Sequence, residues 1–263
     1  MMKTNYHTHT IRCKHAVGAD ESYVKSAILA GFDELGFSDH VPWPFEDGFT
    51  SKIRMTMGQY RDYVDSILLL KEKYRDKIRI CLGLECEYFE EYKDWLIELK
   101  KSDEIEYLIF GNHFAYPENS SYYEGYYGEC IKTTEDLEKY KNATLKGIES
   151  GLFAYVAHPD LFMRCYPEFD SYCEKISEEI CKKAKEKNIL LEYNISGFPY
   201  CEKRGYIGYP AKKFWEIAKE YDCKCIIGYD AHDNHDLEQE IYWNKGIKMI
   251  EEIGIQRVER LSF

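Results

Sequence analysis

Residues 5–15 read NYHTHTIRCKH, and they contain three of the eight histidines of this 263-residue chain. His7 and His9 are two positions apart in a stretch that we predict to be a strand, so both imidazoles point to the same face. His15 follows in the next loop and can fold back over the same opening. Imidazole nitrogen is the commonest neutral ligand for zinc, iron and related ions, so this stretch predicts a metal site.

Four further histidines each come just after a short apolar run that we predict to be a buried strand. They are His40 in FSDH, His113 in FGNH, His158 in VAHPD and His232 in YDAHD. Glu85 ends the apolar run IRICLGLE, where a carboxylate is costly unless it is paired or coordinated. Asp230 and His232 repeat the two-residue spacing of His7 and His9, which again predicts ligands on one face.

Apolar runs alternate with amphipathic stretches along the chain. The predicted strands are residues 3–8, 34–38, 78–85, 106–111, 153–157, 189–194 and 224–229. The predicted helices lie near residues 20–30, 57–75, 89–101, 133–150, 170–187, 210–221 and 236–253. Repeated strand-then-helix units are typical of a parallel sheet that is buried on both faces.

The predicted ligands lie at the carboxyl ends of the predicted strands, which distinguishes a closed barrel from an open sheet. A closed barrel gathers these ends into one rim, where the following loops build the active site. An open sheet would spread them over tens of ångströms, since neighbouring strands lie about 4.8 Å apart. We therefore predict an α/β fold, a distorted TIM-like (β/α)7 barrel, in a single domain of residues 1–263.

Composition limits the classes of partner. Lys plus Arg is 35 and Asp plus Glu is 47, which gives a formal net charge of −12. This negative charge argues against a nucleic-acid-binding protein. No apolar run of the sequence approaches the roughly 20 residues that a membrane-spanning helix needs. The ten cysteines follow no secretory signal sequence and lack zinc-finger spacing, so we expect reduced thiols in a cytoplasmic protein. The sequence leaves the oligomeric state open.

Carboxylates next to two of the ligand histidines are candidates for orienting their rings. Asp39 precedes His40, and Asp160 follows His158 by two residues. A carboxylate that accepts a hydrogen bond from a ligand imidazole fixes the ring and its tautomer. His235 follows no predicted strand, and we leave it outside the metal site.

Two of the loops that follow predicted strands are long. Residues 114–132 are rich in tyrosine and glutamate, and residues 195–209 contain tyrosines together with Lys203 and Arg204. Long loops at this face usually serve as lids or substrate contacts. The alternative is an irregular surface that aromatic packing stabilises.

The segments YHTHT, SDH, GLE, GNH, AHPD and DAH occur in this order, and together they resemble the polymerase and histidinol phosphatase (PHP) family nearly end to end. FSDHVPWP, GLECEYF and NISG are most similar to its stand-alone histidinol-phosphate phosphatases. The resemblance implies a distorted seven-stranded barrel with a trinuclear metal centre. Imidazoles with two carboxylates suit divalent or trivalent zinc, iron or manganese, and the sequence leaves the identity of the ions open. It implies one metal at His7, His9, Glu85 and Asp230, a second at Glu85, His113 and His158, and a third at His15, His40 and His232.

The resemblance also implies arginines that hold a substrate phosphate. The candidates are Arg164, six residues after His158, and Arg204 in the loop after the sixth predicted strand. A guanidinium suits this role because its planar fork donates two hydrogen bonds to phosphate oxygens. Arg12 and Arg54 are alternatives.

The resemblance therefore implies a metal-dependent phosphomonoesterase, a histidinol-phosphatase of histidine biosynthesis that releases L-histidinol and phosphate from L-histidinol phosphate. A water that bridges two cations loses its proton near neutral pH and attacks phosphorus, so we assign no side chain as catalytic residue. The proton donor to the leaving alkoxide stays open. One alternative is a PHP-family phosphatase or phosphodiesterase for another small phosphoester or nucleotide. A metal-storage protein is disfavoured, because nine ligands for three ions leave coordination positions open.

Overall fold

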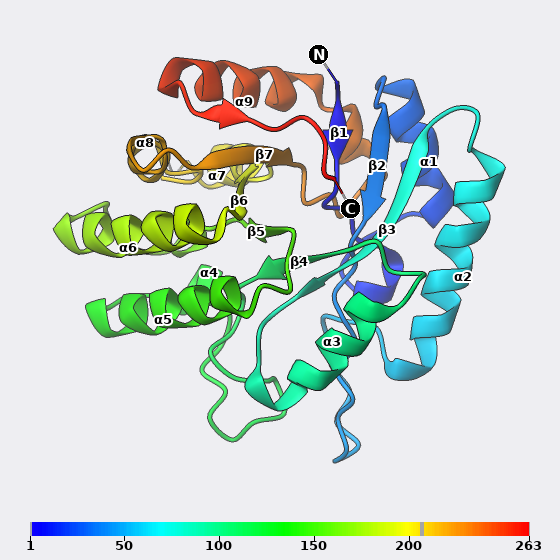
Figure 1. Ribbon diagram of the computed structural model, residues 1–263, viewed down its shortest axis with the longest axis horizontal. Helices are drawn as coiled ribbons and strands as arrows, with labels where there is room; N and C mark the ends of the chain where they lie inside the picture. The colour runs from blue at the N-terminus through cyan, green and yellow to red at the C-terminus, as the bar shows by residue number, and fades with distance from the viewer. Residues whose placement is uncertain (1, 206–207, 263) are drawn as a thin grey trace.

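The computed structural model describes residues 2–205 and 208–262, which form a curled parallel sheet with helices on its outside (Figure 1). The strands pair in sequence order from β1 to β8, and every pair is parallel. The strands are β1 (Thr4–Asn5), β2 (Glu34–Phe37), β3 (Arg79–Cys86), β4 (Tyr107–Gly111), β5 (Tyr155–Ala157), β6 (Leu190–Asn194), β7 (Lys224–Gly228) and β8 (Gln256–Arg257). This arrangement confirms the predicted α/β barrel of distorted shape.

Helices follow the strands and cover the outer face of the sheet. The α-helices are α1 (Asp20–Leu29), α2 (Met57–Lys73), α3 (Lys93–Lys101), α4 (Tyr127–Cys130), α5 (Thr134–Ser150), α6 (Ser171–Lys187), α7 (Gly197–Arg204), α8 (Lys212–Glu220) and α9 (Glu240–Ile253). Short 3-10 helices are η1 (Ile11–Cys13), η2 (Glu90–Tyr92), η3 (Leu161–Arg164) and η4 (Asn234–Glu238). Helix starts carry local signals: Thr133 and Asp136 form a capping box before α5, and the Asp170 carboxylate caps α6.

The barrel closes at the carboxyl ends of the strands through the segments after β1 and β7. Thr8 forms a parallel bridge with Ala231. The His9 N–H donates to the Ala231 carbonyl at 2.9 Å, and the Ala231 N–H donates to the His7 carbonyl at 3.1 Å. At the other end of this seam β8 pairs with β7, and the Thr4 hydroxyl donates to the Glu259 carbonyl at 2.6 Å. The C-terminal segment therefore lies beside β1, as Figure 1 shows.

Two strand predictions and one loop prediction were wrong in detail. The first strand covers Thr4–Asn5 instead of residues 3–8, because the backbone beyond it makes isolated bonds to Ser38 and Ala231 rather than a continuous ladder. The prediction of seven strands missed β8, which has two residues and so carries no alternating pattern. The predicted loop 195–209 contains α7, and its residues 206–207 lie outside the described residues.

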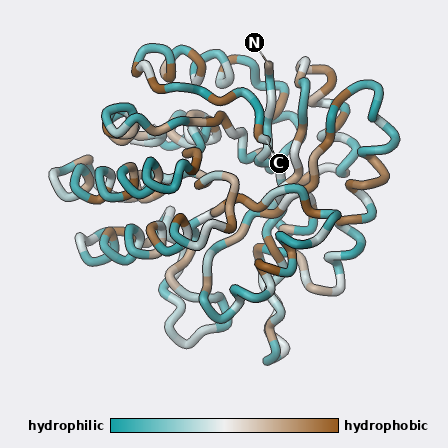
Figure 2. Tube along the Cα trace, in the orientation of Figure 1, coloured by the Kyte–Doolittle hydropathy of each residue, from teal (hydrophilic) through white to brown (hydrophobic). Residues whose placement is uncertain are grey.

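The floor beneath the barrel mouth is packed around Tyr107. Its hydroxyl donates to the Tyr6 carbonyl at 2.8 Å and is also 3.0 Å from the Phe37 carbonyl. The ring needs glycine at its side, since a Cβ on Gly83 would lie 2.6 Å from ring atoms of Tyr107. Figure 2 shows hydrophobic stretches along the strands and hydrophilic turns on the outer helices, so the core lies on both faces of the sheet.

Two further features of the fold are the state of the cysteines and the lengths of the helices. All ten cysteines are free, and most of them are buried. Within residues 2–205 and 208–262, no helix combines the length and the apolar character that crossing a bilayer requires.

Candidate metal centre and substrate cavity

The nine predicted ligands gather at the carboxyl-terminal rim of the barrel. His7 and His9 follow β1, His40 follows β2, Glu85 lies near the carboxyl end of β3, His113 follows β4, His158 follows β5, and Asp230 and His232 follow β7. His15 lies in the loop after η1. His7, His9, His40, Glu85, His113 and His158 are buried, whereas His15 is exposed and the side chains of Asp230 and His232 are 21% and 29% exposed. The group therefore runs from a buried base to an open edge.

Four ligand atoms surround one point at the buried base. His7 Nε2 lies 3.3 Å from Glu85 Oε2 and 3.4 Å from Asp230 Oδ1. His9 Nε2 lies 3.4 Å and 3.2 Å from the same two oxygens. Zinc–ligand distances of about 2.0–2.1 Å give tetrahedron edges of about 3.3–3.4 Å. The four distances thus match the edge length of a tetrahedral coordination shell.

Three of these atoms lack the hydrogen bonds that burial normally demands. His7 Nε2, His9 Nε2 and Glu85 Oε2 are buried and have no hydrogen-bond partner among the described residues. A buried polar atom without a partner costs about 1–3 kcal/mol. They face a common point instead of pairing with one another, so a cation at that point would satisfy all three.

The second oxygen of Glu85 belongs to another group of ligand atoms. Glu85 Oε1 lies 3.2 Å from His113 Nε2 and 3.0 Å from His158 Nε2, and these two nitrogens are 3.3 Å apart. Gly111 leaves room for this carboxylate, because a Cβ there would lie 2.3 Å from Glu85 Oε1. One carboxylate thus faces two groups of ligands, which is the arrangement that bridges two cations.

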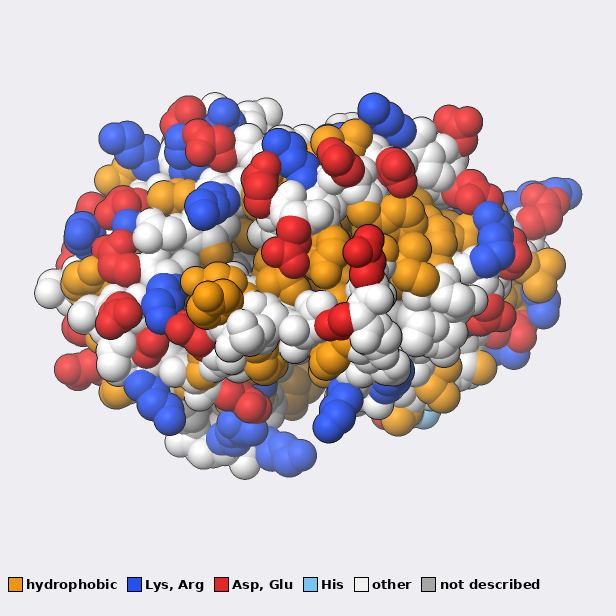
Figure 3. Space-filling model, turned by 90° about the horizontal axis from the view of Figure 1, so that it is seen from below, with side chains coloured by type: hydrophobic (Ala, Val, Ile, Leu, Met, Phe, Trp, Pro, Cys, Tyr) orange, Lys and Arg blue, Asp and Glu red, His pale blue; other side chains and the backbone are white. Residues whose placement is uncertain are grey.

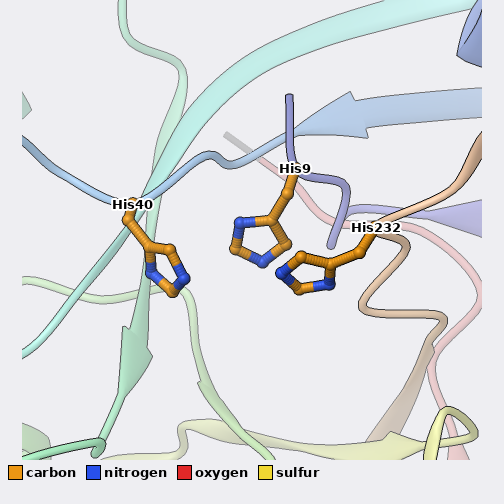
Figure 4. A group of neighbouring side chains, drawn as sticks. All are labelled: His9, His40 and His232. Carbon is orange, nitrogen blue, oxygen red and sulfur yellow. The ribbon is translucent and has the colours of Figure 1, made fainter. Parts of the chain in front are cut away.

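The third predicted group is looser than the other two. His15 Nε2 and His232 Nε2 are 2.9 Å apart, but the centroids of the His40 and His15 rings are 5.5 Å apart. His40 Nδ1 instead lies 3.2 Å from Glu85 Oε2. His9, His40 and His232 form a group whose ligand atoms all lie within 4.8 Å, and Figure 4 shows their rings turned toward one another. The structure therefore brings His15 and His232 together and places His40 closer to the buried base.

Charges within the site separate the carboxylate-rich base from the imidazole-rich edge. Burial opposes ionisation of Glu85, but His113 and His7 outweigh it and hold the pKa of Glu85 well below its usual range. Burial and the neighbouring His9 hold the pKa of His40 well below its ordinary value and lower the pKa of His232 to about 3. At pH 7 the carboxylate is thus ionised and these two imidazoles are neutral. Burial opposes protonation of His9 and His113, but the neighbouring carboxylates outweigh it and raise the pKa of His9 to about 9 and that of His113 to about 10, so a cation that binds these rings would displace their protons.

Two of the predicted ligand residues have a backbone conformation that residues other than glycine rarely adopt. His158 has φ of 33° and Asp230 has φ of 49°, both in the left-handed region. Such residues are uncommon outside glycine and cost about 1–3 kcal/mol each, and they cluster at functional sites. The surrounding contacts hold His158 there, since its backbone N–H donates to Glu192 Oε2 at 3.0 Å.

Two carboxylates that sequence reasoning did not place orient the ligand rings. Glu192 Oε1 lies 2.8 Å from His7 Nδ1, and Glu87 Oε1 lies 2.8 Å from His113 Nδ1. A carboxylate at Nδ1 leaves Nε2 as the ligand atom, and it raises the basicity of the ring. The available signal was a glutamate inside the buried run LLEYN, which is costly without a partner.

The expected partners of His40 and His158 are wrong. Asp39 reaches His9 Nδ1 at 3.5 Å, because adjacent residues in an extended chain point to opposite sides. Asp160 accepts hydrogen bonds from the Ala211 N–H at 2.6 Å and from Trp215 Nε1 at 3.2 Å. It therefore anchors the segment before α8 instead of orienting an imidazole.

One cysteine lies closer to the ligands than its sequence context indicated. The Cys13 sulfur forms a group with His15 and His232 in which the ligand atoms lie within 4.8 Å of one another. Burial raises the pKa of the Cys13 thiol to about 12. It therefore stays protonated beside these imidazoles, and its burial is compatible with a packing role.

A cavity of about 1010 Å³ opens above the ligand cluster. Its walls include Tyr126 and Glu129 from the loop 114–132, and Tyr200 and Lys203 from α7. The two long loops thus supply the walls of the cavity, and they are also packed by aromatic contacts, such as the 5.7 Å between the Tyr116 and Tyr122 rings. A volume near the upper end of about 300–1,000 Å³ suits a small-molecule ligand.

Arg164 lies in the cavity wall, whereas Arg204 lies on its outer rim. Arg164 Nη1 donates to Tyr126 Oη at 2.8 Å, and its guanidinium carbon is 4.0 Å from the Tyr200 ring centroid. Arg164 Nε is buried and has no partner among the described residues. Arg204 is exposed and stacks on the same Tyr200 ring at 4.4 Å, and it is not among the described residues that line the cavity.

Three other residues considered from the sequence lie away from the described lining of the cavity. Arg12 pairs with Asp20 at 2.8 Å. Arg54 is buried and pairs with Glu87 at 3.1 Å, so it supports the site from behind. The side chain of His235 is 69% exposed and approaches only a neighbouring glutamate within η4.

The parallel barrel and the imidazoles and carboxylates at the carboxyl ends of its strands place this chain in the class of α/β-barrel metalloproteins. Residues 5–196 match the family model described as PHP domain, and the chain belongs to this family. This chain is 28% identical over 264 residues to a histidinol-phosphatase of Bacillus subtilis. The alignment covers 90% of this chain and 96% of that protein.

The fold is also similar to that of a histidinol phosphate phosphatase from Lactococcus lactis, solved as a complex with zinc, L-histidinol and phosphate. The TM-score is 0.76 at 20% sequence identity, and the match covers 99% of each chain. At this identity the likeness shows the shared fold.

Proposed function

We propose that this protein is a histidinol-phosphatase, which hydrolyses L-histidinol phosphate to L-histidinol and inorganic phosphate in histidine biosynthesis. The observation that carries the proposal is the carboxylate of Glu85, whose two oxygens face two separate groups of ligand nitrogens below an open cavity. The activity named for the Bacillus subtilis relative and the ligands of the Lactococcus lactis structure support this choice of substrate.

We further propose that the rim holds three metal ions. The ligands would be His7, His9, Glu85 and Asp230 for the first ion, Glu85, His113 and His158 for the second, and His15, His40 and His232 for the third. Nitrogen and oxygen atoms at tetrahedral spacing suit zinc, and iron and manganese accept the same donors. Bound cations would supply Lewis acidity toward phosphoryl oxygens and would lower the pKa of a coordinated water.

The chain's own residues prepare the site for a phosphoryl group. Glu192 and Glu87 hold the rings of His7 and His113 with their Nε2 atoms facing the cluster. Arg164 lines the cavity as a half-buried, permanently charged guanidinium, and this supports its assignment as a phosphate ligand. These groups are fixed before substrate arrives, which reduces the cost of positioning it.

The outer part of the cavity suits the organic half of the substrate. Its lining includes the carboxylates of Glu129 and Asp236 and the tyrosines Tyr200 and Tyr242. Carboxylates attract an ammonium group, and aromatic faces attract both a cation and an imidazole ring. Arg204 stacks on Tyr200 at the rim, and we propose that it contributes to anion attraction there.

The experiment is a measurement of phosphate release by the purified protein from L-histidinol phosphate, before and after treatment with a chelator. We expect turnover that the chelator abolishes and added divalent metal restores. Full activity in chelated, metal-free protein would refute the metal-dependent mechanism. Bis(p-nitrophenyl) phosphate is assayed beside it, and faster hydrolysis of this diester would favour the phosphodiesterase alternative.

We also propose that residues 1–263 form one domain and that the protein is cytoplasmic. One continuous sheet supports the first proposal, since β7 and β8 lie beyond the residues that match the family model. Ten free cysteines support the second. On the face shown in Figure 3, Lys and Arg side chains are scattered among acidic ones, so we propose no nucleic-acid partner. A single calorimetric unfolding transition would test the one-domain proposal.

A further inference from the structure

One tyrosine contacts both the guanidinium of Arg164, through its hydroxyl, and the ring of the predicted ligand His113. Tyr126 precedes α4 in the long loop after β4, and it lines the cavity together with Arg164. Its ring centroid is 5.9 Å from that of His113, and its oxygen accepts a hydrogen bond from Arg164 Nη1 at 2.8 Å. The phenol thus connects the arginine in the wall to the cluster at the base.

The hydroxyl hydrogen of Tyr126 is available for a second hydrogen bond. A guanidinium only donates, so the Tyr126 oxygen acts as the acceptor toward Arg164 and keeps its own hydrogen. Across residues 2–205 and 208–262, this hydrogen finds no acceptor. Burial raises the pKa of the phenol and outweighs the opposing effect of Arg164, so the proton is present at neutral pH.

Gly128 makes this position of the ring possible. A Cβ on residue 128 would lie 2.5 Å from one ring carbon of Tyr126 and 2.9 Å from its hydroxyl oxygen. Contacts this short do not persist, so any side chain at residue 128 must displace the ring. The backbone of Gly128 is not in the left-handed region, so glycine is needed here for space and not for its conformation.

We propose that Tyr126 donates its hydroxyl hydrogen to a phosphoryl oxygen of the substrate beside Arg164, and that Gly128 fixes the ring for this contact. The inference rests on the proposed phosphatase function. Tyr126 touches the substrate, whereas Gly128 acts through Tyr126 and is a positioning residue. The acceptor is a phosphoryl oxygen because the same point is served by a guanidinium, and an anion satisfies both donors at once.

The test uses the variants Tyr126→Phe and Gly128→Ala, singly and combined. Tyr122→Phe is a control from the same loop, since the Tyr122 side chain is 71% exposed. Gly58→Ala is the glycine control, because a Cβ there would meet only Thr56 Oγ1 at 3.8 Å. For each protein we would measure kcat and KM with L-histidinol phosphate, the dissociation constant of inorganic phosphate by calorimetry, metal content and unfolding temperature.

We expect Tyr126→Phe to lower kcat/KM by roughly ten- to a hundredfold, the range for one hydrogen bond to a charged group. Phosphate binding should weaken in the same direction, with metal content unchanged. Gly128→Ala should lose activity similarly, and the double variant should lose little more than Tyr126→Phe alone, because both changes remove one contact. Both controls should match the wild type.

The outcomes separate this inference from the proposed function. Wild-type turnover together with unchanged kcat/KM and phosphate affinity in Tyr126→Phe would overturn the hydroxyl contact. Additive losses in the double variant would overturn the positioning role of Gly128. Absence of any wild-type turnover would count against the proposed function, and the phosphate dissociation constants would still decide whether the hydroxyl binds phosphate. If Gly128→Ala failed to fold, the phosphate affinity of Tyr126→Phe would decide alone.

Discussion

Replacing Glu192 by Gln removes a negative charge that faces His7 while it keeps the size of the side chain. Glu192 Oε1 lies 2.8 Å from His7 Nδ1, and Oε2 accepts hydrogen bonds from the His158 N–H and from Asn194 Nδ2. Burial would lower the pKa of His7, but Glu192, followed by Glu85, outweighs burial and holds that pKa well above its ordinary value. Glutamine therefore leaves His7 in place and makes its ring a weaker metal ligand.

The expected loss of metal affinity follows from the contact between the Glu192 carboxylate and the His7 ring. Loss of a carboxylate behind a ligand imidazole costs roughly 10- to 100-fold in metal affinity, or about 1.4–2.7 kcal/mol. A hydrogen bond to a charged group contributes about 1.5–3 kcal/mol, which is the same range. We therefore expect at least tenfold weaker metal binding, and activity that excess metal restores, because His7 Nε2 still faces Glu85 at 3.3 Å.

The assay is a zinc titration of metal-free protein in competition with a chromophoric chelator, combined with phosphate release at each zinc concentration. Glu216→Gln is the matched control, since this α8 glutamate is 49% exposed and pairs with Lys212 one turn away. Unfolding temperatures establish that both variants are folded. Zinc affinity and activity of Glu192→Gln equal to wild type at limiting zinc would refute the orienting role of Glu192.

Four further substitutions test other parts of the site. Glu85→Gln should reduce both metal content and turnover, because it weakens two groups of ligands at once; full metal content by elemental analysis would remove its bridging role. Arg164→Ala should raise KM and weaken phosphate inhibition by roughly tenfold or more, whereas Arg204→Ala should change them less; equal effects would contradict the placement of Arg204 on the rim. Arg54→Met should cost about 3–5 kcal/mol of unfolding free energy at pH 7, since it removes the guanidinium that pairs with the buried carboxylates of Glu87 and Glu118 and leaves Glu87 with only the His113 ring facing it among the described residues. Burial would raise the pKa of Glu87, but Arg54 outweighs it and lowers that pKa to about 2 from an ordinary 4.5. The wild-type advantage in urea unfolding should therefore be complete above pH 4.5 and shrink as the pH falls toward 2, and a constant difference would refute the ion pair as its source.

The order of strands and the rim position of the ligands followed from local patterns in the sequence. The run IRICLGLE is apolar up to its final carboxylate, and it forms β3 with Glu85 near its end. Such runs specify strands because residue type and period act over a few neighbouring residues. The two-residue strand β8 carries too few residues for a pattern, and its pairing depends on β7, which lies far along the chain.

The partners of the ligand rings could not be predicted in this way. Asp39 is adjacent to His40 in the sequence and accepts a hydrogen bond from its backbone N–H, but the imidazole ring that it approaches is that of His9. The carboxylate that orients His7 is Glu192, which lies 185 residues away on β6. Sequence neighbours were misleading because successive residues of an extended segment face opposite sides, and the curvature of the sheet supplies the true partner.

By itself, the sequence determined the fold class, the kind of ligands and their order along the rim, because hydrophobic period and residue chemistry are local properties. The tertiary structure alone decided that four atoms from β1, β3 and β7 share one point at tetrahedral spacing, and that His40 leans toward Glu85 instead of closing a compact third group. It also decided that Tyr126 and Arg164 meet beside the cluster. These relations depend on distances between segments that only the closure of the barrel brings together, so no run of neighbouring residues encodes them.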